Sequence, residues 1–173
     1  MDNKMSGADV IRIRPATPDD AAAMCRAERE TSRTPGLLIS TEAELSEQDF
    51  RTKIAWLTEA GIYVIAEIDG AAVGHASLEP LPLQAMSHVF SLTVVVHPGY
   101  TGRGIGSALM AHMVAWAEGN PLAEKIELRV REGNAVARRL YARFGFVEEG
   151  RFEKRIKLKD GAYLADMSMA RFL

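Results

Sequence analysis

A glycine-rich segment in the second half of the chain carries the strongest chemical signal. Gly102, Gly104 and Gly106 stand at alternate positions, and a run of valines at 94–96 precedes them. β-Branched runs are typical of buried strands, and glycine lets a backbone approach a ligand with no Cβ in the way. The pattern predicts a strand, a tight turn and a ligand site at that turn.

A helix is predicted directly after these glycines. Ile105, Leu109, Met113 and Ala117 are apolar at helical spacing. The N-terminus of a helix presents N–H groups without partners and the positive end of the helix dipole, which both suit a phosphate. The segment is therefore predicted to bind a phosphate-bearing ligand.

Two common phosphate loops fit poorly. The kinase and ATPase loop requires Lys after its second glycine, where this chain has Ile105. The dinucleotide fingerprint requires Gly-x-Gly-x-x-Gly. Gly102 and Gly104 match its first two glycines, but Ser107 stands where the third glycine is required. Glu127 lies at a tolerable distance for a ribose-binding acid. A dinucleotide-binding oxidoreductase therefore stays open as a weaker alternative.

A third loop matches better. Residues 101–106 read Thr-Gly-Arg-Gly-Ile-Gly, which resembles the coenzyme A loop of the GNAT superfamily of acetyltransferases, Arg/Gln-x-x-Gly-x-Gly/Ala. Residues 134–146 then carry every fixed residue of that family's Asn-x-x-Ala-x-x-Leu-Tyr-x-x-x-Gly-Phe. The two motifs occur in the family's order, and the resemblance spans roughly residues 10–171.

The resemblance implies a fold, a cosubstrate and a set of binding residues. The implied fold is α/β: a central, mixed but mostly antiparallel twisted sheet of six to seven strands, flanked by about four helices and splayed at the coenzyme A strand. The implied cosubstrate is acetyl-CoA, with no metal. The implied cofactor-binding residues are Val94, Val95, Val96, Gly102, Arg103, Gly104, Ile105, Gly106, Ser107 and Asn134.

One loop position departs from the family. Thr101 stands where relatives prefer Arg or Gln. A partly exposed ion pair contributes about 0–1 kcal/mol, whereas each charge-assisted backbone hydrogen bond contributes about 1.5–3 kcal/mol. Because several such backbone bonds converge on a pyrophosphate, the departure predicts only modestly weaker cofactor binding, with Arg103 adding charge at the rim.

The second motif supplies a candidate acid. Asn134 is a good helix N-cap by itself, and Val136, Leu140 and Phe144 form a predicted buried stripe. Tyr141 lies one position off that stripe, and the resemblance assigns its hydroxyl to proton donation toward the departing coenzyme A thiolate. A phenol of pKa about 10 is a feasible donor.

No base is evident. A lysine-like amine has a pKa of about 10, so roughly one molecule in a thousand is neutral at pH 7, a penalty of about 4 kcal/mol. Ser91 and Arg129 occupy the two positions where relatives carry a glutamate base. The remaining candidates are His88, which has the better intrinsic pKa, Glu79, and a water relay through backbone carbonyls.

The elements that must position these groups follow from periodicity and turn signals. Strands are predicted over 11–13, 62–68, 73–79, 89–96, 126–130, 147–159 and 163–171, and helices over 17–31, 46–59 and 105–118, with another from 134. Asp69-Gly70 and Asp160-Gly161 are predicted hairpin turns. This order predicts a mixed α/β sheet with hairpins at both ends.

Size and composition bound the rest. The chain has 173 residues, which suits one domain at 10–173 that follows a loose tail at 1–9. Its formal net charge of −2 provides no positive electrostatic field that would attract nucleic acid. The sequence has no long apolar run, so no membrane span is predicted. The single cysteine, Cys25, predicts a structural thiol in a reducing cytoplasm.

The predicted function is direct acetyl transfer from acetyl-CoA to a primary amine of a small molecule. A non-catalytic coenzyme A-binding module is the rival from another class, and a homodimer is compatible with either. Arg129, with Arg151, Lys154 and Arg155 beside Phe152, favours an amino-acid-like acceptor. Guanidinium groups bind carboxylates through paired hydrogen bonds and repel polyamines.

Overall fold

The computed structural model describes residues 10–173, so the predicted tail at 1–9 lies outside the described residues. The strands are β1 (Arg12–Pro15), β2 (Ile62–Ile68), β3 (Ala71–Pro80), β4 (Val89–Val96), β5 (Lys125–Arg131), β6 (Val147–Lys157) and β7 (Tyr163–Phe172). The helices are α1 (Ala21–Ser32), α2 (Glu47–Ala60), α3 (Ile105–Glu118) and α4 (Ala135–Arg143). Short 3-10 turns are η1 (Pro18–Asp20), η2 (Glu42–Glu44) and η3 (Gln84–Met86).

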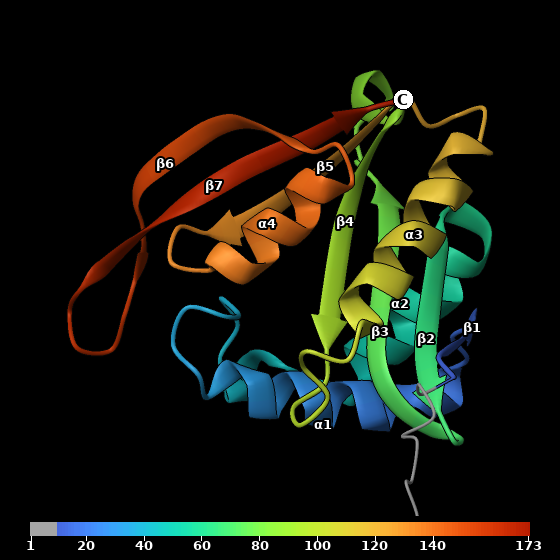
Figure 1. Cartoon of the computed structure of the whole chain (residues 1–173), viewed down its shortest axis with the longest axis horizontal. Coiled ribbons are helices and arrows are strands. Elements are labelled where there is room, and N and C mark those ends of the chain that lie inside the picture. The colour runs from blue at the N-terminus through green and yellow to red at the C-terminus, as the bar shows by residue number, and fades with distance from the viewer. Residues whose placement is uncertain (1–9) are drawn as a thin grey trace, which may run out of the picture.

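The seven strands form one twisted sheet in the order β1-β2-β3-β4-β5-β7-β6 (Figure 1). Each neighbouring pair is antiparallel except β4 and β5, which are parallel. The β2–β3 turn holds Asp69 and Gly70 at φ 50° and 79°, the left-handed conformation that a two-residue hairpin needs. The predicted mixed, mostly antiparallel sheet is confirmed.

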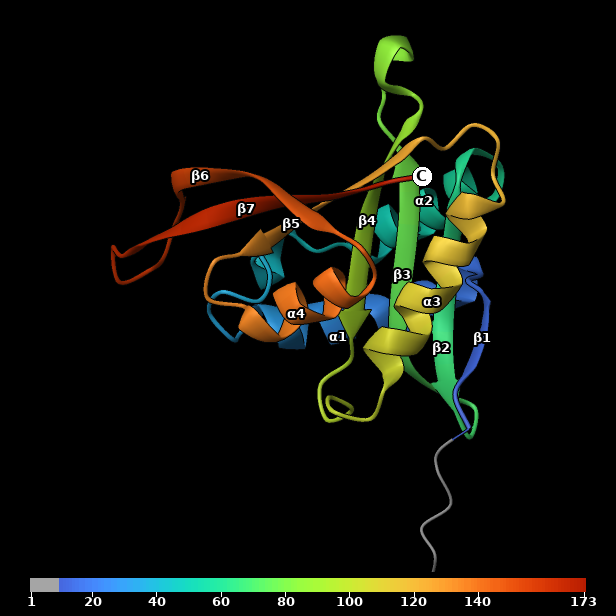
Figure 2. The ribbon, with the colours of Figure 1, turned by 45° about the horizontal axis from the view of Figure 1, so that its top comes forward.

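The sheet is split between β4 and β5. Only residues Val89–Ser91 of β4 pair with β5, where their partners are Lys125–Glu127. Beyond Ser91 and Glu127 the two strands are no longer paired. Figure 2 shows the two strands diverging, with α4 in front of the gap. The splay predicted at the coenzyme A strand is therefore present, and it leaves the later half of β4 with one edge unpaired toward β5.

Two helix layers cover the sheet. α3 packs on one face, where Ile105, Leu109, Met113 and Ala117 are all buried as their spacing predicts. α1 and α2 pack on the opposite face, against side chains of β2 that include Tyr63. Buried Cys25 belongs to this second core, as predicted for a structural thiol.

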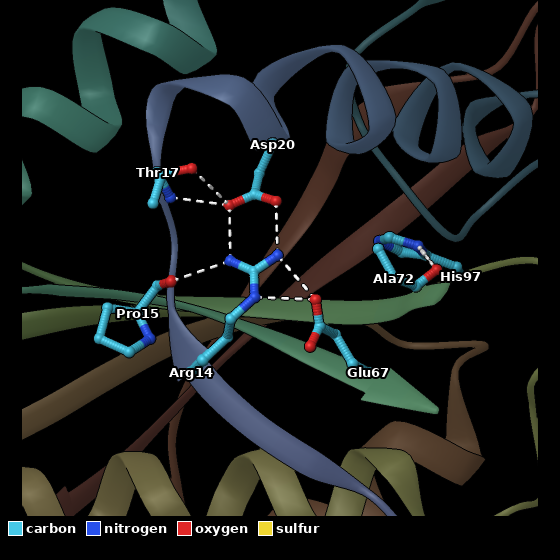
Figure 3. A network of polar contacts seen from close by, with 7 residues as sticks. All are labelled: Arg14, Pro15, Thr17, Asp20, Glu67, Ala72 and His97. Carbon is cyan, nitrogen blue, oxygen red and sulfur yellow. Dashed lines mark hydrogen bonds and ion pairs between the residues drawn. The ribbon is translucent and has the colours of Figure 1, made fainter. Parts of the chain in front are cut away.

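An ion cluster fixes the start of α1 to the sheet edge (Figure 3). The guanidinium of Arg14 donates to both carboxylate oxygens of Asp20 at 2.8 Å, to Glu67 at 2.8 Å and to the Pro15 carbonyl at 3.0 Å. Asp20 also accepts from the backbone N–H of Thr17 at 2.7 Å, which caps η1. The hydrogen bonds from Arg14 lower the pKa of Asp20.

Some predictions of detail were wrong. Val136 was predicted to be buried in a stripe along α4, but it is 73% exposed, and Leu140 and Phe144 are only partly buried. The reason is the placement of α4, which lies over the gap between β4 and β5 rather than on a continuous sheet. Tyr141, placed off the stripe, is instead the buried residue of this helix.

Candidate active site

The split in the sheet opens into a cleft of about 770 Å³. Its walls come from β4, β5 and α4 on one side and from α1, η2, α2 and β2 on the other. The predicted site residues Val94, Val95, Val96, Asn134 and Tyr141 all line it, as does Thr101. The structure therefore brings the β4 valines, the first residue of the glycine loop and the α4 motif to one cavity, whereas the other predicted loop residues, 102–107, are not part of its lining.

The glycine loop joins the end of β4 to α3. Gly104 is the N-cap of α3 with φ 81°, and the first bond of the helix runs from the Ala108 N–H to its carbonyl at 3.0 Å. The N–H groups of the first helical turn, at 105–107, have no acceptor within the helix. An added Cβ on Gly104 would meet nothing within 4 Å, so the loop's outer surface is open to a ligand.

Gly106 has a different role. A Cβ there would lie 3.0 Å from Cδ2 of Leu140, so the missing side chain lets α3 approach α4. The same two helices are linked by Arg143, whose Nη2 donates to the Ser107 hydroxyl at 3.2 Å. A guanidinium thus stands beside the loop's N–H groups, a feature that the motif alone does not specify. Arg103, at the rim, lies over the ring of Tyr100 at 5.3 Å.

Asn134 and Tyr141 lie at opposite ends of α4. The side chain of Asn134 accepts from the Ala137 N–H at 3.2 Å, so it is the helix N-cap and also faces the cleft. Tyr141 is 9% exposed, and burial raises the pKa of its hydroxyl. That hydroxyl makes no hydrogen bond to any of residues 10–173, and its raised pKa keeps it protonated and able to donate.

The two bases considered from the sequence lie elsewhere. His88 is exposed, does not line the cleft, and precedes β4 at the end opposite the glycine loop. Glu79 lies on β3 and forms an ion pair with Lys53 at 2.9 Å, outside the cleft lining. The structure does not bring either side chain together with Tyr141.

A buried hydrogen-bonded chain reaches the cleft from the other side. Glu28 on α1 lines the cleft, and its Oε1 lies 2.9 Å from Nε2 of His75. Nδ1 of His75 lies 2.9 Å from Nε2 of His97, whose Nδ1 lies 3.1 Å from the Ala72 carbonyl (Figure 3 shows this last contact). Burial, and then the charge of His75, lowers the pKa of His97 from 6.5 to about 4.

The opposite wall carries two guanidinium groups from β5. Arg129 lies over the Phe152 ring at 4.4 Å. Arg131 is 9% exposed; its Nη2 donates to the Arg129 carbonyl at 3.0 Å, and its Nε lies 3.2 Å from buried Asp166 without hydrogen-bond geometry. Burial lowers the pKa of Arg131. An anion in the cleft would relieve this desolvated charge.

Neither Arg131 nor the Glu28 chain was predicted. The available signal was polar residues in apolar strands: His75 within β3, His97 directly after the valine run, and Arg131 ending β5. Of the charges expected near the acceptor, only Arg129 lines the cleft. Arg151 pairs with Glu132 and Glu153, Lys154 lies over Tyr163, and Arg155 lies over Phe152.

Comparison with known proteins settles the family. The profile of the acetyltransferase (GNAT) family matches residues 24–146, more than half of the chain. The chain belongs to this family. It is an acetyl-CoA-dependent acetyltransferase, which removes the non-catalytic module and the dinucleotide-binding oxidoreductase as alternatives.

Two curated proteins similar to this acetyltransferase are named N-acetyltransferases. It is 34% identical over 108 residues to the L-amino acid N-acetyltransferase AaaT of Escherichia coli, covering 62% of this chain and 66% of that protein. It is 28% identical over 161 residues to the phosphinothricin N-acetyltransferase of Alcaligenes faecalis, covering 92% and 81%.

A solved structure shares the fold. The GNAT superfamily phosphinothricin acetyltransferase from Sinorhizobium meliloti, in complex with acetyl-CoA, has a TM-score of 0.85 at 20% identity, covering 94% of this chain and 88% of that one. Within residues 10–173, no helix of this acetyltransferase combines the length and apolar character that crossing a membrane requires.

Proposed function

We propose that this acetyltransferase transfers the acetyl group of acetyl-CoA directly to the primary amine of a small, amino-acid-like molecule. The observation that carries the proposal is the cleft itself. One wall presents the carboxylates of Glu28, Glu44 and Asp49, and the other presents the guanidinium groups of Arg129 and Arg131. A zwitterion with an ammonium and a carboxylate is complementary to both walls.

The cofactor is proposed to occupy the gap in the sheet. The N–H groups at 102–107 would bind its pyrophosphate, with Arg143 contributing charge. The unpaired edge of β4 would pair with the amide groups of the pantetheine arm, as an added strand does. In this binding mode the thioester would lie beside Tyr141, which lines the cleft from α4.

The proposed reaction needs no acyl-enzyme. The neutral amine attacks the thioester carbonyl, a C–N bond forms, and the C–S bond breaks. The thiolate takes a proton from the Tyr141 hydroxyl, which recovers one from the amine nitrogen. Cys25 is 2% exposed in the α1–α2 core and does not line the cleft, so it is not placed to act as a nucleophile.

The test is an acceptor comparison with release of coenzyme A thiol as the readout. Free amino acids, their methyl esters and polyamines are assayed side by side at low salt. We expect the free acids to be preferred, and Arg129→Gln to remove that preference. Arg139→Gln, an exposed arginine on α4 outside the cleft, is the matched control and should keep the preference. Preference of the native enzyme for esters or polyamines would overturn the proposed acceptor class.

A further inference from the structure

The acceptor amine must lose a proton before it attacks, and the predicted bases lie outside the cleft. A hydrogen-bonded chain of titratable groups, Glu28–His75–His97, begins at the cleft wall and runs into the protein interior. It joins a carboxylate at the cleft wall to two imidazoles and a fixed carbonyl through contacts of 2.9, 2.9 and 3.1 Å. His75 is fully buried, and Glu28 has a side-chain exposure of 14%.

The direction of the chain follows from its closed end. The Ala72 carbonyl can only accept, so Nδ1 of His97 must donate to it. His97 stays neutral at neutral pH because of its lowered pKa, so its Nε2 is an acceptor and Nδ1 of His75 donates. Because the ring proton of neutral His75 is on Nδ1, its Nε2 carries no proton and faces Oε1 of Glu28.

The contact between Glu28 and His75, at the cleft end of the chain, holds one proton. When Glu28 is protonated, it can donate to Nε2 of neutral His75; when His75 carries the proton, its Nε2 donates to the carboxylate. Either way all three contacts are satisfied hydrogen bonds. A fully deprotonated chain would leave a contact in which two acceptors face each other, which is costly in a buried site.

We propose that Glu28 is the general base of this acetyltransferase and that His75 and His97 are its positioning residues. The Oε1–Nε2 contact between Glu28 and His75 keeps its own proton throughout. The ammonium of the acceptor gives its proton to the other carboxylate oxygen of Glu28, and the neutral amine attacks. In balance, R–NH₃⁺ and acetyl-CoA give the acetamide, coenzyme A thiol and one proton, which Glu28 returns to water. The inference rests on the proposed function.

The surroundings keep this base in place. The His75 ring is held between Phe50 and Tyr63, with ring centroids at 6.3 and 6.0 Å. Burial raises the pKa of Tyr63 well above its usual value, with the nearby charge of Glu28 contributing, so Tyr63 remains neutral. The other charged groups on this wall are Glu44 from η2 and Asp49 and Lys53 from α2.

The kinetic test is Glu28→Gln, with Glu30→Gln as the control, since Glu30 is exposed on the same helix and does not line the cleft. We expect kcat to fall about 10²–10⁴-fold at pH 7, with the KM for acetyl-CoA unchanged. The loss should shrink about tenfold per pH unit toward pH 9, because more acceptor is already neutral in solution. His75→Gln should lose less than Glu28→Gln and show the same pH trend.

Two kinetic results would overturn the proposal. A higher KM for the acceptor with unchanged kcat would make Glu28 a binding residue, and a loss that is equal at all pH values would make it structural. A native enzyme that acetylates no amine would instead remove the proposed function. In that case ¹H–¹⁵N spectra of the imidazole rings decide on the chain: protonated Nδ1 on both His75 and His97 supports it, and a bare Nδ1 on His97 refutes it.

Discussion

Two polar clusters beside α1 use similar residues in opposite ways. Around Arg14 at the start of the helix, every guanidinium nitrogen has a partner, and the cluster joins β1, η1 and β2 (Figure 3). Around Glu28, one carboxylate oxygen is bound by His75 while the side chain borders the open cleft. A saturated cluster, in which every hydrogen-bonding group already has a partner, can only hold elements together. A cluster with an unused hydrogen-bonding group at a cavity can also act on a ligand.

The same contrast separates other parts of the molecule. The Tyr141 hydroxyl, the first-turn N–H groups of α3 and the unpaired edge of β4 all have unused hydrogen-bonding capacity near the cleft. Substitutions there should change activity more than stability, and substitutions in the saturated cluster should do the reverse.

The largest effect is expected in the cofactor loop. Gly104→Val puts a branched side chain where the pyrophosphate should lie, so coenzyme A affinity should fall by about 10³-fold or more, measured by calorimetry. Gly70→Val is the matched control, because Gly70 has a similar positive φ of 79° and open surroundings in the β2–β3 turn. Unchanged coenzyme A binding by the Gly104 variant would mean that the loop is only a turn.

Tyr141→Phe should have the next largest effect. Without the hydroxyl the thiolate has no nearby donor, so kcat should drop about 10²-fold while the affinity for acetyl-CoA stays nearly constant. Tyr163→Phe, at an exposed tyrosine on the β6–β7 hairpin, should leave kcat as it is. Full turnover by the Tyr141 variant would reduce this residue to packing.

Breaking the saturated cluster should affect stability alone. Arg14→Met leaves Asp20 and Glu67 without their partner, and both carboxylates are mostly buried, so the free energy of unfolding should fall by about 2 kcal/mol. Arg33→Met removes a well-exposed ion pair with Glu42 and should leave the free energy of unfolding nearly unchanged, because solvent screens that pair. Denaturant unfolding measures both; a large drop in kcat for Arg14→Met would contradict the division of roles.

The buried imidazoles should give a smaller, pH-dependent effect. Because the pKa of His97 is lowered from 6.5 to about 4, the unfolded chain binds a proton that the folded chain does not take up. The free energy of unfolding should therefore fall as pH drops from 7 to 5, by about 2 kcal/mol from this residue. In His97→Gln the free energy of unfolding should depend less steeply on pH between 7 and 5. The same pH dependence in both proteins would contradict a buried, neutral His97.

The sequence was sufficient where local pattern decides structure. α3 runs over Ile105–Glu118 as its apolar spacing predicts, and β4 ends where the valine run ends. Contacts between distant segments could not be read in this way: Glu28 and His75 are 47 residues apart and meet only when α1 packs on the sheet. The stripe predicted on α4 was wrong for the same reason, because the gap beneath that helix arises from the parting of β4 and β5.

The most direct test of the account is a crystal structure of this acetyltransferase with acetyl-CoA. The account predicts the pantetheine arm along the unpaired edge of β4, the pyrophosphate on the N–H groups at 102–107, and the thioester sulfur within hydrogen-bond distance of the Tyr141 hydroxyl. A cofactor bound outside the gap between β4 and β5, or a sulfur far from Tyr141, would contradict it.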